Sequence, residues 1–123
     1  MHTVLFTDPF LRDAKAAGLD DEELMNIASI IAADPTAGKL VRGTGGARKL
    51  RFPRRGGGKS DGYRTVHYFG GEDVPVFMIA LVDKASREDL TQTQRNELAD
   101  VLPRIADACR ASVAERTRKG RRR

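Results

Sequence analysis

The sequence is poor in the residues that build disulfides, metal sites and cofactor pockets. Its 123 residues include one cysteine, two histidines and no tryptophan. A single cysteine has no partner for an intrachain disulfide, and His2 and His67 are not accompanied by the spaced ligands that a metal site needs. We therefore expect no cofactor and no bound metal, with Cys109 packed as an ordinary apolar side chain.

Long apolar runs are also missing. The longest ones, such as residues 74–82, fall far short of the roughly 20 residues that a membrane-spanning helix requires. The first ten residues, MHTVLFTDPF, contain no basic segment that leads into a long apolar stretch, which argues against a secretory signal. These absences favour a cytoplasmic protein.

Glycine is plentiful, but it does not form a nucleotide-binding motif. Residues 58–60, GKS, resemble the end of a phosphate-binding loop, yet Pro53 occupies the position where that motif requires its first glycine. The GTGG run at residues 43–46 does not complete a dinucleotide fingerprint either. The sequence therefore gives no support to a nucleotide cofactor.

What the chain does have is a concentration of positive charge. Residues 42–64 hold eight Lys or Arg against one Asp, and the last eight residues, RTRKGRRR, add six more cations. The rest of the chain is net acidic, so the total is only +5. A local cationic surface on an acidic body favours a polyanionic partner, and the phosphodiester backbone of nucleic acids is the commonest one.

Residue patterning predicts a strand at residues 3–7 and two helices after it. The first helix is short and ends near Gly18, and the second begins at an Asp20 cap and stops at residues 34–35, Asp-Pro. The hydrophobic period then changes to two. This change, with short turn-rich links, predicts three antiparallel strands at residues 47–52, 62–69 and 75–82.

A last helix is predicted from Thr91 onward, with a kink or break at Pro103 because the proline ring clashes with the preceding turn. Residues 116–123 have no apolar anchor and are predicted to form a disordered basic tail, which leaves residues 1–115 as the folded domain. The order β-α-α-β-β-β-α predicts an α+β fold: an antiparallel sheet with helices packed on one face.

Strand alternation places Lys49 and Arg51 on one side of their strand, and an antiparallel neighbour would bring Arg64 beside them. Like charges opposed across strands repel one another, so stability alone does not explain the group. The simplest alternative is an exposed strand that charge keeps soluble. We interpret the group as a polyanion-binding face, with further nucleic-acid contacts predicted at Arg48, Arg54, Arg55, Lys59 and Tyr68.

Three strings follow one another along the chain: VRGTGGARKLRF, GYRTVHYF and VDKASREDLTQTQRNEL. Together they resemble the RelE/HigB superfamily of bacterial toxins, and the HigB branch fits best. The resemblance implies a compact RelE-like fold and a ribosome-dependent endoribonuclease that cuts mRNA without a metal ion. It also implies three partners: a cognate antitoxin that holds the toxin inactive, the ribosome and mRNA.

The same resemblance implies a set of catalytic residues, Lys49, Arg51, Arg64 and Lys84. In the chemistry it implies, the 2′-hydroxyl of the RNA attacks the adjacent phosphorus. Arg51 and Arg64 would then stabilise the charge on the phosphate oxygens, and Lys49 or Lys84 would transfer protons. Some members carry a C-terminal tyrosine for this step, whereas this chain has residues 90–91, Leu-Thr, in that region.

Two alternatives stay open at the level of sequence. One is a ParE-like inhibitor of DNA gyrase, which belongs to the same superfamily and performs no RNA chemistry. The other is a non-catalytic module that binds RNA or the ribosome, in which the basic residues only neutralise phosphates and binding depends steeply on salt.

Overall fold

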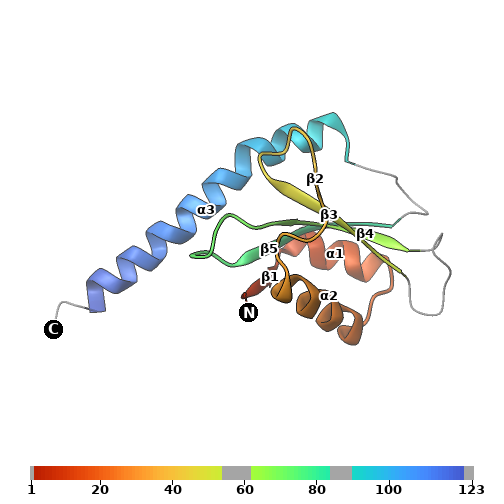
Figure 1. Ribbon diagram of the computed structural model, residues 1–123, viewed down its shortest axis with the longest axis horizontal. Coiled ribbons are helices and arrows are strands. Elements are labelled where there is room, and N and C mark those ends of the chain that lie inside the picture. Colours follow the sequence, from red (N-terminus) through yellow and green to blue (C-terminus); the bar gives the residue numbers. More distant parts are fainter. Residues whose placement is uncertain (1, 54–61, 84–89, 121–123) are drawn as a thin grey trace.

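The computed structural model describes residues 2–53, 62–83 and 90–120, and for Asp83 and residues 113–120 it describes the backbone alone. In chain order the elements are β1 (Val4–Phe6), α1 (Asp8–Ala16), α2 (Asp21–Ala33), β2 (Lys39–Leu40), β3 (Ala47–Phe52), β4 (Tyr63–Tyr68), β5 (Val76–Asp83) and α3 (Gln92–Gly120). The strands form one five-stranded sheet in the order β1-β5-β4-β3-β2 (Figure 1). The predicted α+β class is confirmed.

The cap of the second helix is the one that the sequence predicts, whereas the first helix is capped by Thr7, one residue before the Asp8-Pro9 pair from which its start is predicted. Thr7 caps α1 and also donates its hydroxyl to the Met78 carbonyl oxygen at 2.8 Å, which ties the start of the helix to β5. At α2, the Asp20 carboxylate accepts from the backbone N–H of Glu23 at 2.8 Å, and the Glu23 side chain accepts from that of Asp20. These reciprocal bonds satisfy two of the amide groups that a helix start leaves without partners.

The strands β3, β4 and β5 form an antiparallel meander, close to the bounds predicted from the sequence. Strand β1 pairs with β5 in parallel, so the sheet is mostly but not wholly antiparallel. Strand β2 pairs with β3 at the far edge and was not predicted. It is two residues long, too short for an alternating pattern to reveal it.

Helices cover both faces of the sheet, so the prediction that they pack on one face is corrected. Helices α1 and α2 close the first face around a buried core that includes Phe10, Ile31 and Met78. Helix α3 lies against the second face, where its Leu102 and Ala106 are buried against the sheet (Figure 1). The physical reason is that β4 and β5 carry apolar side chains on both faces, and both sets need cover.

Helix α3 runs through Pro103 without a break. The ring of Pro103 is exposed, while Leu98, Leu102 and Ala106 pack against the sheet before and after it, so both parts of the helix are anchored. Further along, the Arg110 guanidinium donates to the Asp73 carboxylate at 2.6 Å and to the Gly70 carbonyl oxygen at 2.9 Å. These contacts fasten α3 to the turn between β4 and β5.

Beyond Arg110, α3 projects past the sheet (Figure 1). The backbone of residues 116–120 continues the helix, whereas the sequence predicts a disordered tail from residue 116. Alanine, glutamate, arginine and lysine, which occur beyond Arg110, have high helix propensities. Residues 121–123 lie outside the described residues.

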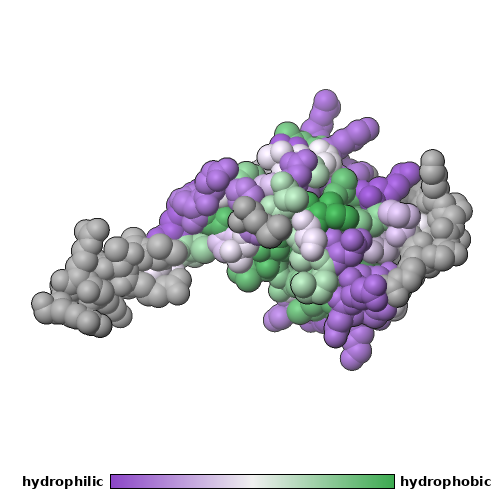
Figure 2. All heavy atoms as spheres, turned by 60° about the horizontal axis from the view of Figure 1, so that its bottom comes forward, coloured by the Kyte–Doolittle hydropathy of each residue, from purple (hydrophilic) through white to green (hydrophobic). Residues whose placement is uncertain are grey.

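Hydrophilic side chains surround a hydrophobic area near the middle of the face that Figure 2 displays. Exposed apolar side chains are scattered over several elements and include Leu5, Met25 and Leu40. Within residues 2–53, 62–83 and 90–120, no helix combines the length and the hydropathy needed to cross a membrane.

Candidate functional site

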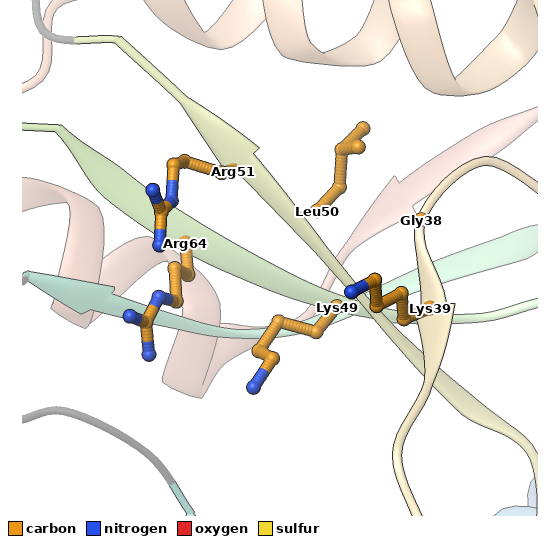
Figure 3. A pocket seen from close by; sticks show the side chains of 6 residues that line it. All are labelled: Gly38, Lys39, Lys49, Leu50, Arg51 and Arg64. Atoms are coloured by element: carbon orange, nitrogen blue, oxygen red, sulfur yellow. The ribbon is translucent and has the colours of Figure 1, made fainter. Parts of the chain in front are cut away.

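Three cationic residues of β3 and β4, namely Lys49, Arg51 and Arg64, come together on the second face, away from the residues that α3 covers. Arg51 and Arg64 are direct partners across the β3–β4 pair, and Lys49 precedes Arg51 by two residues on the same side of β3. Figure 3 shows these three side chains extending to one side of the sheet, while Leu50 extends to the other. The convergence that strand alternation predicts is therefore present.

These three cations line an open pocket with a volume of about 500 Å³. The other described residues that line it are Gly38, Lys39 and Leu50, and no described lining residue belongs to α3. Lys49 and Arg64 are half-buried and Arg51 is exposed, so the pocket is wet and reachable. The four cationic side chains that the described lining contributes suit an anion that keeps part of its hydration.

The chemistry of this pocket follows from its donors. Each guanidinium can present two parallel N–H groups to a pair of phosphate oxygens, and each ammonium adds a compact positive charge. Such donors also stabilise negative charge that grows on a phosphate during a reaction. Arg51 and Arg64 carry like charges at directly opposite positions, and an anion bound beside them is attracted to both.

Arg48, which the sequence predicts as a nucleic-acid contact, does not line this pocket. It alternates with Lys49 on β3 and therefore points to the opposite face. Its guanidinium Nη1 donates to the carbonyl oxygens of Thr36 at 3.0 Å and Gly38 at 3.3 Å. Arg48 thus holds the segment before β2 in place from behind the pocket.

Tyr68 is also placed differently from its prediction as a nucleic-acid contact. It lies on the same face as Arg64, but only 8% of its surface is exposed because α3 packs over that end of β4. Its neighbours there include Leu102 and Ala106. Tyr68 is a core residue that helps to seat α3, and its ring is not available to a base.

The remaining predicted site residues, namely Lys84, Arg54, Arg55 and Lys59, lie outside the described residues. Their roles stay predictions. Lys39, in contrast, lines the pocket although sequence reasoning missed it. It falls before the basic segment and in a two-residue strand, and the signal that could have found it is the Gly38 that precedes it.

His67 lies on the first face and is fully buried. Its Nε2 lies 3.0 Å from the carbonyl oxygen of Pro35, so that nitrogen carries the proton and donates it. Its Nδ1 has no hydrogen-bond partner within the described part of the chain. Burial lowers the pKa of His67 below its ordinary value, because removing the ring from water disfavours the charged form. The residue therefore acts as a neutral support for the loop between α2 and β2.

Fold and site together define a small α+β protein with a cationic pocket on the open part of its sheet, a class suited to nucleic-acid backbone. A family model described as the RelE toxin of the RelE/RelB toxin-antitoxin system matches residues 2–121. The chain therefore belongs to the RelE toxin family. It is by that membership the toxin of a toxin-antitoxin pair, with an antitoxin as its partner.

A solved structure of the E. coli toxin RelE, a double arginine-to-alanine mutant in the free state, resembles this chain. The TM-score is 0.50 at 23% sequence identity, and the match covers 69% of this chain and 86% of that one. At this identity the likeness shows the fold, and it agrees with the family assignment.

Proposed function

We propose that the protein is a ribosome-dependent mRNA endoribonuclease that inhibits translation in the cytoplasm. The observation that carries the proposal is the pocket in which Arg51 and Arg64 face each other across two strands with Lys49 beside them. Within the family we place the chain in the HigB branch, on the strength of the strings GYRTVHYF and VDKASREDL.

The proposed reaction uses no metal ion. The 2′-hydroxyl of one nucleotide attacks the adjacent phosphorus, the bond to the 5′-oxygen of the next nucleotide breaks, and a 2′,3′-cyclic phosphate and a 5′-hydroxyl result. One proton leaves the 2′-oxygen and one is delivered to the departing 5′-oxygen. The protein must orient the linkage, stabilise charge on the phosphate oxygens and move these protons.

Residue roles follow from the positions of the side chains. Arg51 and Arg64 are directly opposed, which lets both guanidinium groups reach the oxygens of one phosphate. Two lysines are candidates for proton transfer: Lys49, which lines the pocket, and Lys84, which lies outside the described residues. Both lysines have the chemistry for this step, and the experiment that separates them is substitution of each in turn.

The character of the pocket supports a need for the ribosome. Among the described residues that line it none is aromatic, so the pocket offers phosphate contacts without a platform on which bases stack. An open pocket of this kind does little to bend a free RNA strand into the geometry for 2′-hydroxyl attack. The ribosome, which already holds the mRNA in its decoding site, supplies that positioning in our proposal.

The test is induction of the wild-type chain and of Arg64→Ala in bacteria, with mapping of RNA 5′ ends. We expect wild-type cuts within translated codons, and loss of both the cuts and the growth arrest in Arg64→Ala. Arg12→Ala is the matched control, because Arg12 is an exposed arginine on α1, which covers the first face. It should cut as the wild type does.

Other outcomes would overturn the proposal. Intact cutting by Arg64→Ala would remove the site. DNA double-strand breaks and an SOS response without mRNA fragments would favour a gyrase inhibitor. Binding to ribosomes without any cut product would favour the non-catalytic module, whose only role is to neutralise phosphates.

A further inference from the structure

We infer that Lys39 forms a second phosphate subsite, which holds the phosphate adjacent to the one that is cleaved. The inference rests on the proposed function, because it assigns Arg51 and Arg64 to the cleaved linkage. Lys39 lines the same pocket as these two arginines, but it enters from β2, on the other side of β3.

The register of the sheet sets the spacing of the two subsites. Arg51 pairs with Arg64 across β3 and β4, whereas Lys39 pairs with Lys49 across β2 and β3. The two pairs are offset by two residues along β3, which corresponds to about 7 Å. Successive phosphates of an extended RNA strand are separated by a comparable distance, so one strand can place neighbouring phosphates at both pairs.

The pairing of Lys39 with Lys49 is electrostatically unfavourable. Residues that are directly opposite on antiparallel strands project to the same side, and like charges in such a pair destabilise the sheet. Strand β2 has only two residues, so its backbone pairing contributes little to offset the repulsion. A phosphate bound beside Lys39 is attracted to its ammonium group and to the positive charge of the neighbouring Lys49.

The segment that carries Lys39 is nevertheless held firmly by contacts behind the pocket. Arg48 donates to the carbonyl oxygens of Thr36 and Gly38, one residue before Lys39. Gly38 has a φ of +88°, and a Cβ atom on it would overlap the carbonyl oxygen of Lys49. Only glycine lets the segment approach β3 this closely. The fold thus keeps Lys39 against the pocket despite the charge repulsion.

A double-mutant cycle, in which one change is made in the protein and one in the RNA, tests the inference. It uses short synthetic mRNAs whose cleaved nucleotide carries a 2′-O-methyl group. One RNA has normal phosphates, and the others replace a single linkage with an uncharged methylphosphonate at the cleaved position or at either neighbour. Binding to the wild type and to Lys39→Ala is measured free in solution and on programmed ribosomes. Lys15→Ala is the matched control, because Lys15 is an exposed lysine on α1, which covers the first face.

We expect the wild type to lose about three- to fivefold in affinity when one neighbouring phosphate loses its charge. Lys39→Ala should bind the normal RNA more weakly by a similar factor. It should bind the RNA with that methylphosphonate no more weakly than the wild type does, because both changes remove the same contact. Its slope of log affinity against log salt should also fall by about 0.7 for a single strand. Lys15→Ala should behave as the wild type.

Two results would overturn the inference. Independent losses from Lys39→Ala and from both neighbouring methylphosphonates would mean that Lys39 touches neither phosphate. If the effect of Lys39→Ala is non-additive only with the methylphosphonate at the cleaved linkage, Lys39 belongs to the first subsite. Failure of the proposed function is visible separately: an RNA with its free 2′-hydroxyl would then stay uncut by the wild type on ribosomes, whatever the binding cycle shows.

Discussion

The second face of the sheet has two ends of opposite character. Where β4 and β5 pass under α3, side chains such as Val66 and Tyr68 are buried. Two residues before Val66 on the same side of β4, Arg64 lines an open cationic pocket. The difference shows that the reach of α3 decides which part of this face becomes core and which part stays available to a ligand.

The division also separates stability from activity. The covered end stabilises the fold by burying apolar surface, whereas the open end gathers like charges that oppose folding. Substitutions at the covered end should therefore change the free energy of unfolding, and substitutions at the open end should change the rate of cleavage. Four predictions test this separation, in order of decreasing effect.

Leu102→Ala should give the largest loss of stability. Leu102 is fully buried under α3, and truncating such a side chain costs about 2–5 kcal/mol because of lost burial and the cavity left behind. Urea unfolding measures the change. Val101→Ala is the control, since Val101 is its neighbour in sequence and is 42% exposed, and it should cost no more than about 0.5 kcal/mol. Equal losses in the two variants would show that α3 does not seal the sheet.

Arg51→Ala should change activity and spare stability. Loss of one preorganised donor to a phosphate typically lowers a reaction rate by about 10²-fold or more. Thermal unfolding should stay the same or rise slightly, because one of two facing positive charges is gone. Single-turnover cleavage on programmed ribosomes, with circular dichroism to follow unfolding, checks both parts. A clear fall in the unfolding temperature of Arg51→Ala would show that Arg51 stabilises the fold, and would contradict this prediction.

Gly38→Ala should have a smaller effect, but it should lower both the free energy of unfolding and the affinity for RNA. An alanine there is strained at φ +88° and overlaps the backbone of Lys49, so we expect a loss of about 1–3 kcal/mol and weaker RNA binding. Gly18→Ala provides the matched control, because Gly18 has a similar φ of +81° with open space around it. Its loss should reflect backbone strain alone and leave RNA binding unchanged. An equal binding defect in both variants would contradict the proposed role of Gly38.

The smallest effect concerns pH and His67. Burial lowers the pKa of His67, with a smaller lowering from Arg48 and opposing contributions from the Pro35 carbonyl and Asp34. The unfolded chain therefore binds a proton below about pH 6.5 that the folded chain does not take up, and stability should fall as the pH drops below this value. The slope should be at most about 1.4 kcal/mol per pH unit.

His67→Gln removes this titration, and unfolding measured from pH 8 to pH 5 should then lack the corresponding part of the slope. An unchanged slope in His67→Gln would assign the acid sensitivity to other groups. Cleavage per folded molecule should be insensitive to the substitution, because His67 lies on the face opposite the pocket.

Local pattern was enough to predict much of this molecule. The Asp20 cap, the bounds of β3 and the shared side of Lys49 and Arg51 each depend on neighbouring residues alone, and the structure confirms them. Pairing of Arg51 with Arg64 needed only that the strands β3 and β4, which follow each other in the chain, run antiparallel. Such features follow from the geometry of a single strand or turn.

The features that sequence reasoning missed depend on contacts between distant segments. Tyr68 is buried because α3, which follows much later in the chain, packs over it. Arg48 faces away from the pocket and finds its partners in a loop whose path no periodicity reveals. Lys39 enters the pocket because Gly38 lets that loop approach β3. These placements are set by tertiary packing, and a pattern within one segment does not encode them.

The central claim is that the open cationic pocket promotes attack of an RNA 2′-hydroxyl on its own phosphate. Single-turnover cleavage of mRNA on programmed ribosomes tests this most directly, with a free 2′-hydroxyl or a 2′-O-methyl group at the cleaved nucleotide. Our account predicts rapid cutting of the first RNA to a 2′,3′-cyclic phosphate and a 5′-hydroxyl, no cutting of the second, and about 10²-fold slower cutting by Arg64→Ala. Cleavage of the 2′-O-methyl RNA, or product ends that carry a 5′-phosphate, would contradict it.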